Sequence, residues 1–150
     1  MISTLDFKID ELSSMRKYPD NLFYIGNIDL LQKKKISFVG SRSPNQYAKN
    51  LTYQLSNKLS QAGICIVSGG AIGIDTSTKY NFPLRNELIV ALGEILIVTY
   101  ADVNSGTTRS IEFALKMKKR IFVLPHRIGE SDGTNKLLLE KKAEAIYDID

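Results

Sequence analysis

Short apolar runs alternate with amphipathic stretches along most of the chain. The runs at 36–39, 64–67, 94–99 and 120–125 are rich in β-branched residues, which is typical of buried strands in a covered parallel sheet. Apolar residues recur every three or four positions from Tyr47 to Ala62, which predicts a helix covering the sheet and ending at Gly63. Ser43, followed by Pro44, is the expected N-cap of this helix.

Further helices are expected at 74–80, 84–92, 107–118 and 133–141, and an edge strand at 145–147. Strand and helix therefore alternate about five times. The pattern predicts an α/β fold with a doubly wound, mostly parallel sheet of about five to six strands and helices on both faces. We expect one domain over 1–150, in which 1–20 form a short N-terminal extension with Ile9, Leu12 and Met15 on one side of a short helix.

A glycine-rich turn, Ser68-Gly69-Gly70-Ala71-Ile72-Gly73, follows the second apolar run and leads into an expected helix. Glycines permit close approach of the backbone to a ligand, and a helix N-terminus favours phosphate. Ser68 stands where a dinucleotide fingerprint needs its first glycine, and no Gly-Lys-Ser/Thr step exists for a Walker loop. The turn indicates phosphate binding but neither standard nucleotide site, and a purely structural turn remains the alternative.

Four loops are expected at the carboxyl edge of the sheet, where ligands of such folds bind: 40–44, 68–75, 100–107 and 125–135. They carry hydroxyls, amides, glycines and one guanidinium, which suit an anion. The side chains concerned are Ser41, Arg42, Ser68, Ser105, Thr107, Thr134 and Asn135. No convincing nucleophile and base accompany them, so we expect a site that holds phosphates, with no catalytic residue and no cofactor.

Composition adds little to this picture. The chain has 150 residues, a formal net charge of +4 and 43% hydrophobic residues, which fits a globular protein with a mild preference for polyanions. One cysteine, Cys65, is expected as a buried apolar side chain, and one histidine, His126, as an ordinary loop residue. A histidine-based metal site is excluded. No leader or membrane-spanning run is apparent, so a cytoplasmic location is expected.

Five motifs occur in order and together resemble the DNA-processing protein A family (DprA, also called Smf). They are 39–44 (Val-Gly-Ser-Arg-Ser-Pro), 68–75 (Ser-Gly-Gly-Ala-Ile-Gly-Ile-Asp), 82–86 (Phe-Pro-Leu-Arg-Asn), Ser105-Gly106 with Ser110 and Ala114, and 133–135 (Gly-Thr-Asn). The resemblance implies a Rossmann-like domain that binds single-stranded DNA and helps to load the RecA recombinase during natural transformation. It also implies a non-enzymatic protein and a plausible homodimer.

The resemblance also assigns roles to single residues. Arg42 would grip a DNA phosphate, Lys79 would meet another phosphate, and Phe82 would stack on a base. Arg85 matches the Arg-Asn step of the family, for which an ion pair within the fold is the alternative to DNA contact. The full set expected to bind DNA or phosphate is Ser41, Arg42, Ser68, Gly69, Gly70, Gly73, Lys79, Phe82, Arg85, Ser105, Gly106, Thr134 and Asn135.

The chain departs from the family between Asp75 and Phe82, where family members carry several tens of additional residues. Two other functions therefore stay open. One is a small-nucleotide protein, such as a nucleoside-monophosphate phosphoribohydrolase, although Ser105-Gly106-Thr107 lacks the glycine-rich lead-in of that loop and Glu112 is wrongly spaced. The other is a degraded paralogue that folds but binds nothing.

Overall fold

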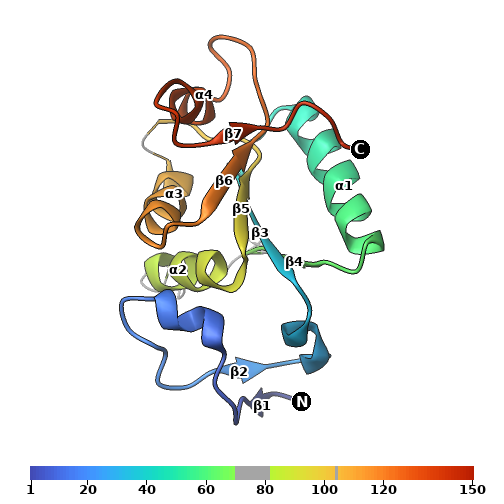
Figure 1. The fold of residues 1–150 in the computed structure, drawn as a ribbon, viewed down its shortest axis with the longest axis vertical. Coiled ribbons are helices and arrows are strands. Elements are labelled where there is room, and N and C mark those ends of the chain that lie inside the picture. Colours follow the sequence, from blue (N-terminus) through green and yellow to red (C-terminus); the bar gives the residue numbers. More distant parts are fainter. Residues whose placement is uncertain (70–81, 104) are drawn as a thin grey trace.

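The computed structural model describes residues 1–69, 82–103 and 105–150, with only the main chain of Phe82 and Pro83. Its centre is a five-stranded parallel sheet with the order β4-β3-β5-β6-β7 (Figure 1). The strands are β3 (Lys35–Val39), β4 (Cys65–Val67), β5 (Ile95–Val98), β6 (Arg120–Val123) and β7 (Glu144–Ala145). The predicted parallel sheet is confirmed.

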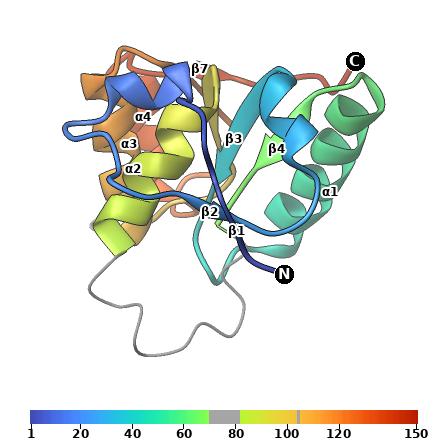
Figure 2. The same cartoon turned by 90° about the horizontal axis from the view of Figure 1, so that it is seen from below.

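Helices cover both faces of the sheet, as predicted. The helix α1 (Gln46–Gln61) lies on one face, while α2 (Phe82–Leu92), α3 (Gly106–Lys116) and α4 (Asp132–Leu139) lie on the other (Figures 1 and 2). Side chains of β5 show why the strand is apolar throughout. Ile97 packs with Phe38 and with Leu55 of α1, whereas Leu96 and Val98 belong to the cluster on the opposite face.

The apolar run at 64–67, expected as a buried strand, forms an edge of the described sheet. β4 pairs only with β3 there, and all three of its residues are half-buried. Cys65 is accordingly half-buried, so the prediction of a buried thiol was wrong. The last strand, β7, lies at the opposite edge, as predicted.

The N-terminal segment packs on α2. Ile9, Leu12 and Met15 are buried around the 3-10 helix η1 (Asp10–Ser14) and contact Ala91 of α2. The short strands β1 (Ser3–Thr4) and β2 (Phe23–Tyr24) form a separate antiparallel pair, and η2 (Ile28–Gln32) leads into β3. The prediction that these three apolar residues share one side is confirmed, although the helix between them is a five-residue 3-10 helix.

Two ion pairs fasten this segment. The Arg16 guanidinium donates to the carboxylate of Glu87, whose side chain is only 3% exposed, and the Arg16 main-chain N–H donates to the same carboxylate at 2.7 Å. The ammonium of Lys35 lies 2.8 Å from a carboxylate oxygen of Glu11. Lys35 is buried and also donates to the main-chain oxygens of Leu31 and Lys33. Lys33 and Lys34 are exposed, so Lys35 alone of this lysine run is held inside the fold.

The end of α2 is held by polar contacts to its carbonyl groups. Ser37 in β3 donates its hydroxyl to Ile89 O, and Lys119 donates to the oxygens of Ala91 and Gly93 at 3.1 and 2.7 Å. A cation is favourable at this end of a helix dipole. Among residues 1–69, 82–103 and 105–150, no helix has the length and apolar character needed to span a membrane.

Candidate functional site

The strand order reverses at β3. From β3 the chain continues to β4 on one side, whereas β5, β6 and β7 follow on the other side. In open α/β sheets, ligands bind outside the carboxyl ends of the strands at such a switch point. The residues just beyond β3 and β5, which include Ser41 and Tyr100, therefore lie at the expected position of a ligand.

The two strand ends remain joined beyond the sheet. Ser41 N–H donates to Tyr100 O at 2.8 Å, and Thr99 N–H donates to Val39 O at 3.0 Å. A β-carbon on Gly40 would lie 2.5 Å from Thr99 Oγ1, so only glycine fits this close approach. The 40–44 loop consequently leaves the sheet in a fixed direction.

Arg42 is exposed on this loop, where the sequence places a phosphate contact. The predicted cap beside it was wrong. Asn45, not Ser43, is the N-cap of α1, and its side chain accepts the N–H of Ala48 at 2.8 Å. Ser43 instead donates its N–H to the Ser41 hydroxyl at 3.2 Å, which keeps 41–43 in a turn before the helix begins.

The loop after β6 is built by two residues from the predicted site. Thr134 is fully buried, and its hydroxyl shares a 2.6 Å hydrogen bond with that of Ser131. Ser131 Oγ also accepts the N–H of Ala101, so this loop is fixed to the end of β5. Asn135 donates its side-chain amide to the main-chain oxygens of Arg127 and Glu130. In this structure both side chains hold the loop.

Ser105 and Gly106 lie at the start of α3. Ser105 is the N-cap residue but makes no side-chain cap hydrogen bond, and its buried Oγ has no partner within the described part of the chain. Gly106 is exposed as the first residue of the helix. Thr107 is buried just behind it. Ser105 and Gly106 are thus at the carboxyl edge of the sheet, as expected, next to the loop that follows β5.

Arg85 reaches from the first turns of α2 toward the glycine turn. A β-carbon on Gly69 would lie 2.7 Å from Arg85 Nη2 and 3.4 Å from Ile89 Cδ1, so the guanidinium passes directly over the Gly69 α-carbon. Ser68 and Gly69 follow β4 at the carboxyl edge. Gly70, Gly73, Lys79 and the side chain of Phe82 lie outside the described residues, as do Asp75 and the helix expected at 74–80.

Sequence reasoning missed the role of His126. Its Nε2–H donates to Thr99 O at 2.9 Å, and its ring lies edge-on between Tyr47 and Tyr100, with 5.2 Å between centroids in each case. The Nδ1 atom is buried without a partner in the described part of the chain. The one available signal was position, because His126 directly follows a predicted strand and so belongs to the same edge as the other loops.

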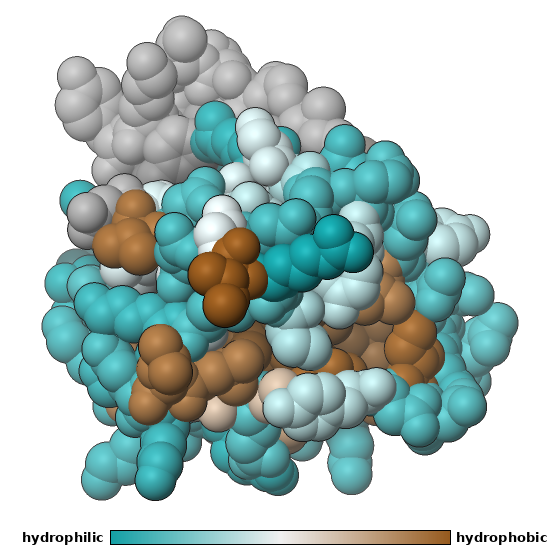
Figure 3. All heavy atoms as spheres, turned by 90° about the horizontal axis from the view of Figure 1, so that it is seen from above, coloured by the Kyte–Doolittle hydropathy of each residue, from teal (hydrophilic) through white to brown (hydrophobic). Residues whose placement is uncertain are grey.

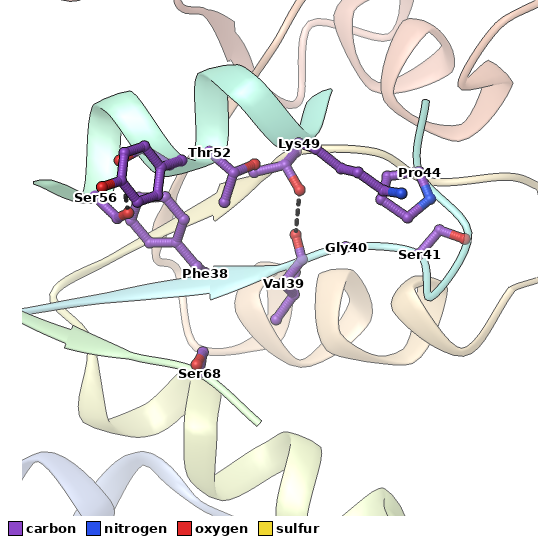
Figure 4. Close-up of a pocket in the computed structure, with 11 residues that line it drawn as sticks. Phe38, Val39, Gly40, Ser41, Pro44, Lys49, Thr52, Ser56 and Ser68 are labelled. Atoms are coloured by element: carbon purple, nitrogen blue, oxygen red, sulfur yellow. Dashed lines mark hydrogen bonds between the residues drawn. The ribbon is translucent and has the colours of Figure 1, made fainter. Parts of the chain in front are cut away.

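A cleft of about 470 Å³ opens between β3 and α1 beside this edge (Figure 4). It is lined by residues of four segments, among them Phe38 and Ser41 from β3 and its loop, Lys49, Thr52, Tyr53 and Ser56 from α1, Ser68 after β4 and Thr99 after β5. The surface viewed from the end where α1 begins is largely hydrophilic, with hydrophobic side chains in separate spots (Figure 3). The surface there is therefore mixed rather than one continuous apolar patch.

The profile of the family described as DNA recombination-mediator protein A matches residues 8–79 and 76–150. The chain belongs to this family. The match is in two parts that meet at 76–79, where the sequence indicated that additional residues of the family are missing. The family predicted from the five motifs is therefore confirmed.

The curated relatives are longer than this chain and share about a quarter of its aligned residues. The chain is 27% identical to DNA processing protein DprA of Streptococcus pneumoniae and 25% identical to that of Bacillus subtilis, over 87% and 91% of its own length. It spans 64% of each of these proteins and 50% of protein Smf from Escherichia coli, to which it is 24% identical. The Streptococcus alignment is 183 positions long, whereas 87% of the 150-residue chain is about 130 residues, so roughly fifty positions have no counterpart here.

Solved structures of the family have the same fold. A structure of DNA processing protein A from Helicobacter pylori, described as showing its single-stranded DNA binding mode, superposes with a TM-score of 0.93 at 29% identity. That alignment covers 99% of this chain and 92% of the other. The Streptococcus pneumoniae structure gives 0.76 at 23% identity over 97% and 70% of the two chains, which supports the fold alone.

Proposed function

We propose that this protein binds single-stranded DNA at the carboxyl edge of its sheet. The observation that carries the proposal is the exposed Arg42 on a loop fixed between β3 and β5, at the switch point of a fold shared with a DNA-binding relative. A guanidinium there suits a phosphate, since its planar fork donates two parallel hydrogen bonds. The bound DNA strand would also pass along Ser41, Ser68 and Gly69, with Arg85 beside them.

The proposed role is binding rather than catalysis. Phosphate contacts fix the position of a strand without reading its sequence, so we expect little base preference. The sequence-predicted contacts Gly70, Gly73, Lys79 and Phe82 remain part of the proposal, with Phe82 stacking on a base. Ser105 and Gly106 would contact the strand at the start of α3, whereas Thr134 and Asn135 would act by holding their loop.

Fluorescence anisotropy with labelled oligo-dT tests the binding. We expect affinity to fall with salt with a log–log slope of roughly −0.7 for each phosphate contacted. Arg42→Ala should weaken binding and reduce that slope. Arg120→Ala is the matched control, because Arg120 is also exposed but begins β6 at the opposite edge of the sheet. Absence of salt-sensitive binding by the folded wild type, or equal binding by Arg42→Ala, would refute the proposal.

A role in loading RecA and assembly as a homodimer are proposed from family membership alone. The support is the family match over most of the chain, together with relatives that are themselves named as DNA processing proteins. Sedimentation of the purified protein tests the dimer. Strand exchange by RecA on DNA coated with single-strand binding protein tests the loading, and acceleration that Arg42→Ala abolishes is the expected result.

A further inference from the structure

The cleft between β3 and α1 begins where the proposed DNA site ends. At about 470 Å³ it falls within the range of small-molecule sites. Ser41 belongs both to the 40–44 loop and to the cleft lining, so a strand that contacts this loop can continue into the cleft without leaving the surface. None of the residues predicted from the sequence to bind DNA or phosphate lies on α1.

The end of the cleft nearest the loop carries hydrogen-bond donors. The Lys49 side chain runs along α1 toward Pro44, so its ammonium lies at that end (Figure 4). Lys49 is exposed, and no carboxylate of the described residues lies within ion-pair distance of its Nζ. Ser41 accepts a hydrogen bond from Ser43 N–H, which leaves its own proton for an acceptor in the cleft. An ammonium and a hydroxyl donor suit a phosphate.

The other end offers acceptors. Thr52 donates its hydroxyl proton to Ala48 O at 2.6 Å, and Ser56 donates to Tyr53 O at 3.1 Å. Because these protons are engaged within α1, both hydroxyls present lone pairs to the cleft, which suit the N–H groups of a base rather than a phosphate. Phe38 supplies a buried apolar wall, and Tyr53 is 74% exposed at this end.

We propose that this cleft holds one nucleotide unit of the bound single strand, next to the unit gripped by Arg42. Its phosphate lies at Lys49 and Ser41, and its base lies toward Tyr53, Thr52 and Ser56. The order of donors and acceptors along the cleft matches the order of phosphate and base in a nucleotide. The inference rests on the proposed DNA binding and adds a subsite to it.

Variants on α1 test the subsite with the whole chain. Lys49→Ala should weaken oligo-dT binding several-fold and make the salt slope shallower by about 0.7, as expected for one lost phosphate contact. Tyr53→Ala should weaken binding about 5- to 150-fold through loss of one stacked base, with an unchanged salt slope. Lys58→Ala is the matched control, because Lys58 is an exposed lysine on the same helix outside the cleft. It should bind like the wild type.

Photocrosslinking supplies a second readout that does not depend on affinity. Oligo-dT containing 5-iododeoxyuridine should crosslink to the tryptic peptide 50–58, which contains Tyr53, and thermal melting should show that every variant is folded. Loss of binding in Arg42→Ala with unchanged binding in Lys49→Ala and Tyr53→Ala, and no crosslink to 50–58, would overturn the subsite and leave the DNA proposal intact. Absence of oligonucleotide binding by the wild type would overturn both.

A free nucleotide is the competing occupant of this cleft, because it carries the same phosphate and base. Labelled thymidine monophosphate, titrated in the same buffer, should bind far more weakly than the oligonucleotide. Tight binding of the free nucleotide that depends on Lys49, without oligonucleotide binding, would refute a subsite for a DNA strand. The cleft would then be assigned to small nucleotides.

Discussion

His126 donates its Nε2–H to the main-chain oxygen of Thr99, with 2.9 Å between the two atoms. The next residue, Tyr100, accepts the N–H of Ser41, so one chain of contacts joins the loop after β6 to the loop that carries Arg42. The histidine ring also packs edge-on against Tyr47 in the first turn of α1. His126 thus connects three of the loops at the carboxyl edge, although it has no direct part in the proposed phosphate contacts.

Replacement of His126 by Phe should keep the ring contacts and remove the hydrogen bond. Leaving Thr99 O without its donor should lower the free energy of unfolding by about 1–3 kcal/mol. His126→Gln is the matched control, because its side-chain amide supplies a donor near the same position and should recover part of the loss. Urea unfolding measures both variants, and equal stability of wild type and His126→Phe would contradict this role.

Gly93 should not tolerate a side chain. A β-carbon there would collide with the Ser37 hydroxyl and lie 2.5 Å from Ser37 N, in the middle of β3. Gly93→Ala should therefore destabilise the protein by about 1–3 kcal/mol through overpacking and loss of the Ser37–Ile89 hydrogen bond. Gly106→Ala is the contrast, since open space surrounds Gly106 in α3 and alanine should be neutral or stabilising by up to about 1 kcal/mol. Similar thermal melts for the two variants would refute the argument.

The strands and helices were largely predictable because each rests on a local signal. Buried parallel strands require apolar residues on both faces, as at Leu96, Ile97 and Val98, and Gly63 adopts a positive φ of 85° just after α1. The buried side of Ile9, Leu12 and Met15 followed from the same periodicity. That the chain forms a single domain stays a prediction.

What the sequence could not provide depends on contacts between distant residues. Local composition suggests a solvated Lys35, but the Glu11 carboxylate and two carbonyl groups make its burial favourable. Asn45 prevails as the cap over Ser43, because residues 41–43 form a turn, α1 begins only at Gln46, and the Asn45 side chain accepts the N–H of Ala48. The polar positions of α1 that line the cleft look like an ordinary exposed helix face until β3 is placed beneath them. Among the predicted site residues, DNA contact by Ser41, Arg42 and Arg85 stays a prediction.

The Arg16–Glu87 pair should make stability depend on pH. Burial alone would raise the pKa of Glu87, but hydrogen bonds from the guanidinium and main-chain N–H of Arg16 outweigh it, so this pKa lies below its ordinary value of 4.5. A lowered carboxyl pKa stabilises the folded state above the unfolded-state pKa, and this stabilisation is lost as the pH falls through the folded-state value.

We therefore expect the free energy of unfolding of the wild type to decrease as the pH drops below about 4.5. The decrease should be less steep in Glu87→Gln. At neutral pH, Arg16→Ala should lower the free energy of unfolding, because the buried carboxylate loses a charged donor. Asp20→Asn breaks an exposed ion pair with Lys17 and should change little. Urea unfolding between pH 3.5 and 7 measures all four proteins, and parallel pH profiles for wild type and Glu87→Gln would count against the pair.

The contact between Gly69 and Arg85 predicts that the two positions act as one unit in DNA binding. Arg85→Ala removes a cation beside the glycine turn and should weaken oligo-dT binding. Gly69→Ala should weaken it too, since the added methyl group lies 2.7 Å from Arg85 Nη2 and displaces the guanidinium. In the Arg85→Ala background that methyl group meets no guanidinium, so Gly69→Ala should weaken binding less there than in the wild type. Anisotropy gives the coupling and thermal melting checks folding, and additive losses from the two substitutions would show that Arg85 and Gly69 act independently.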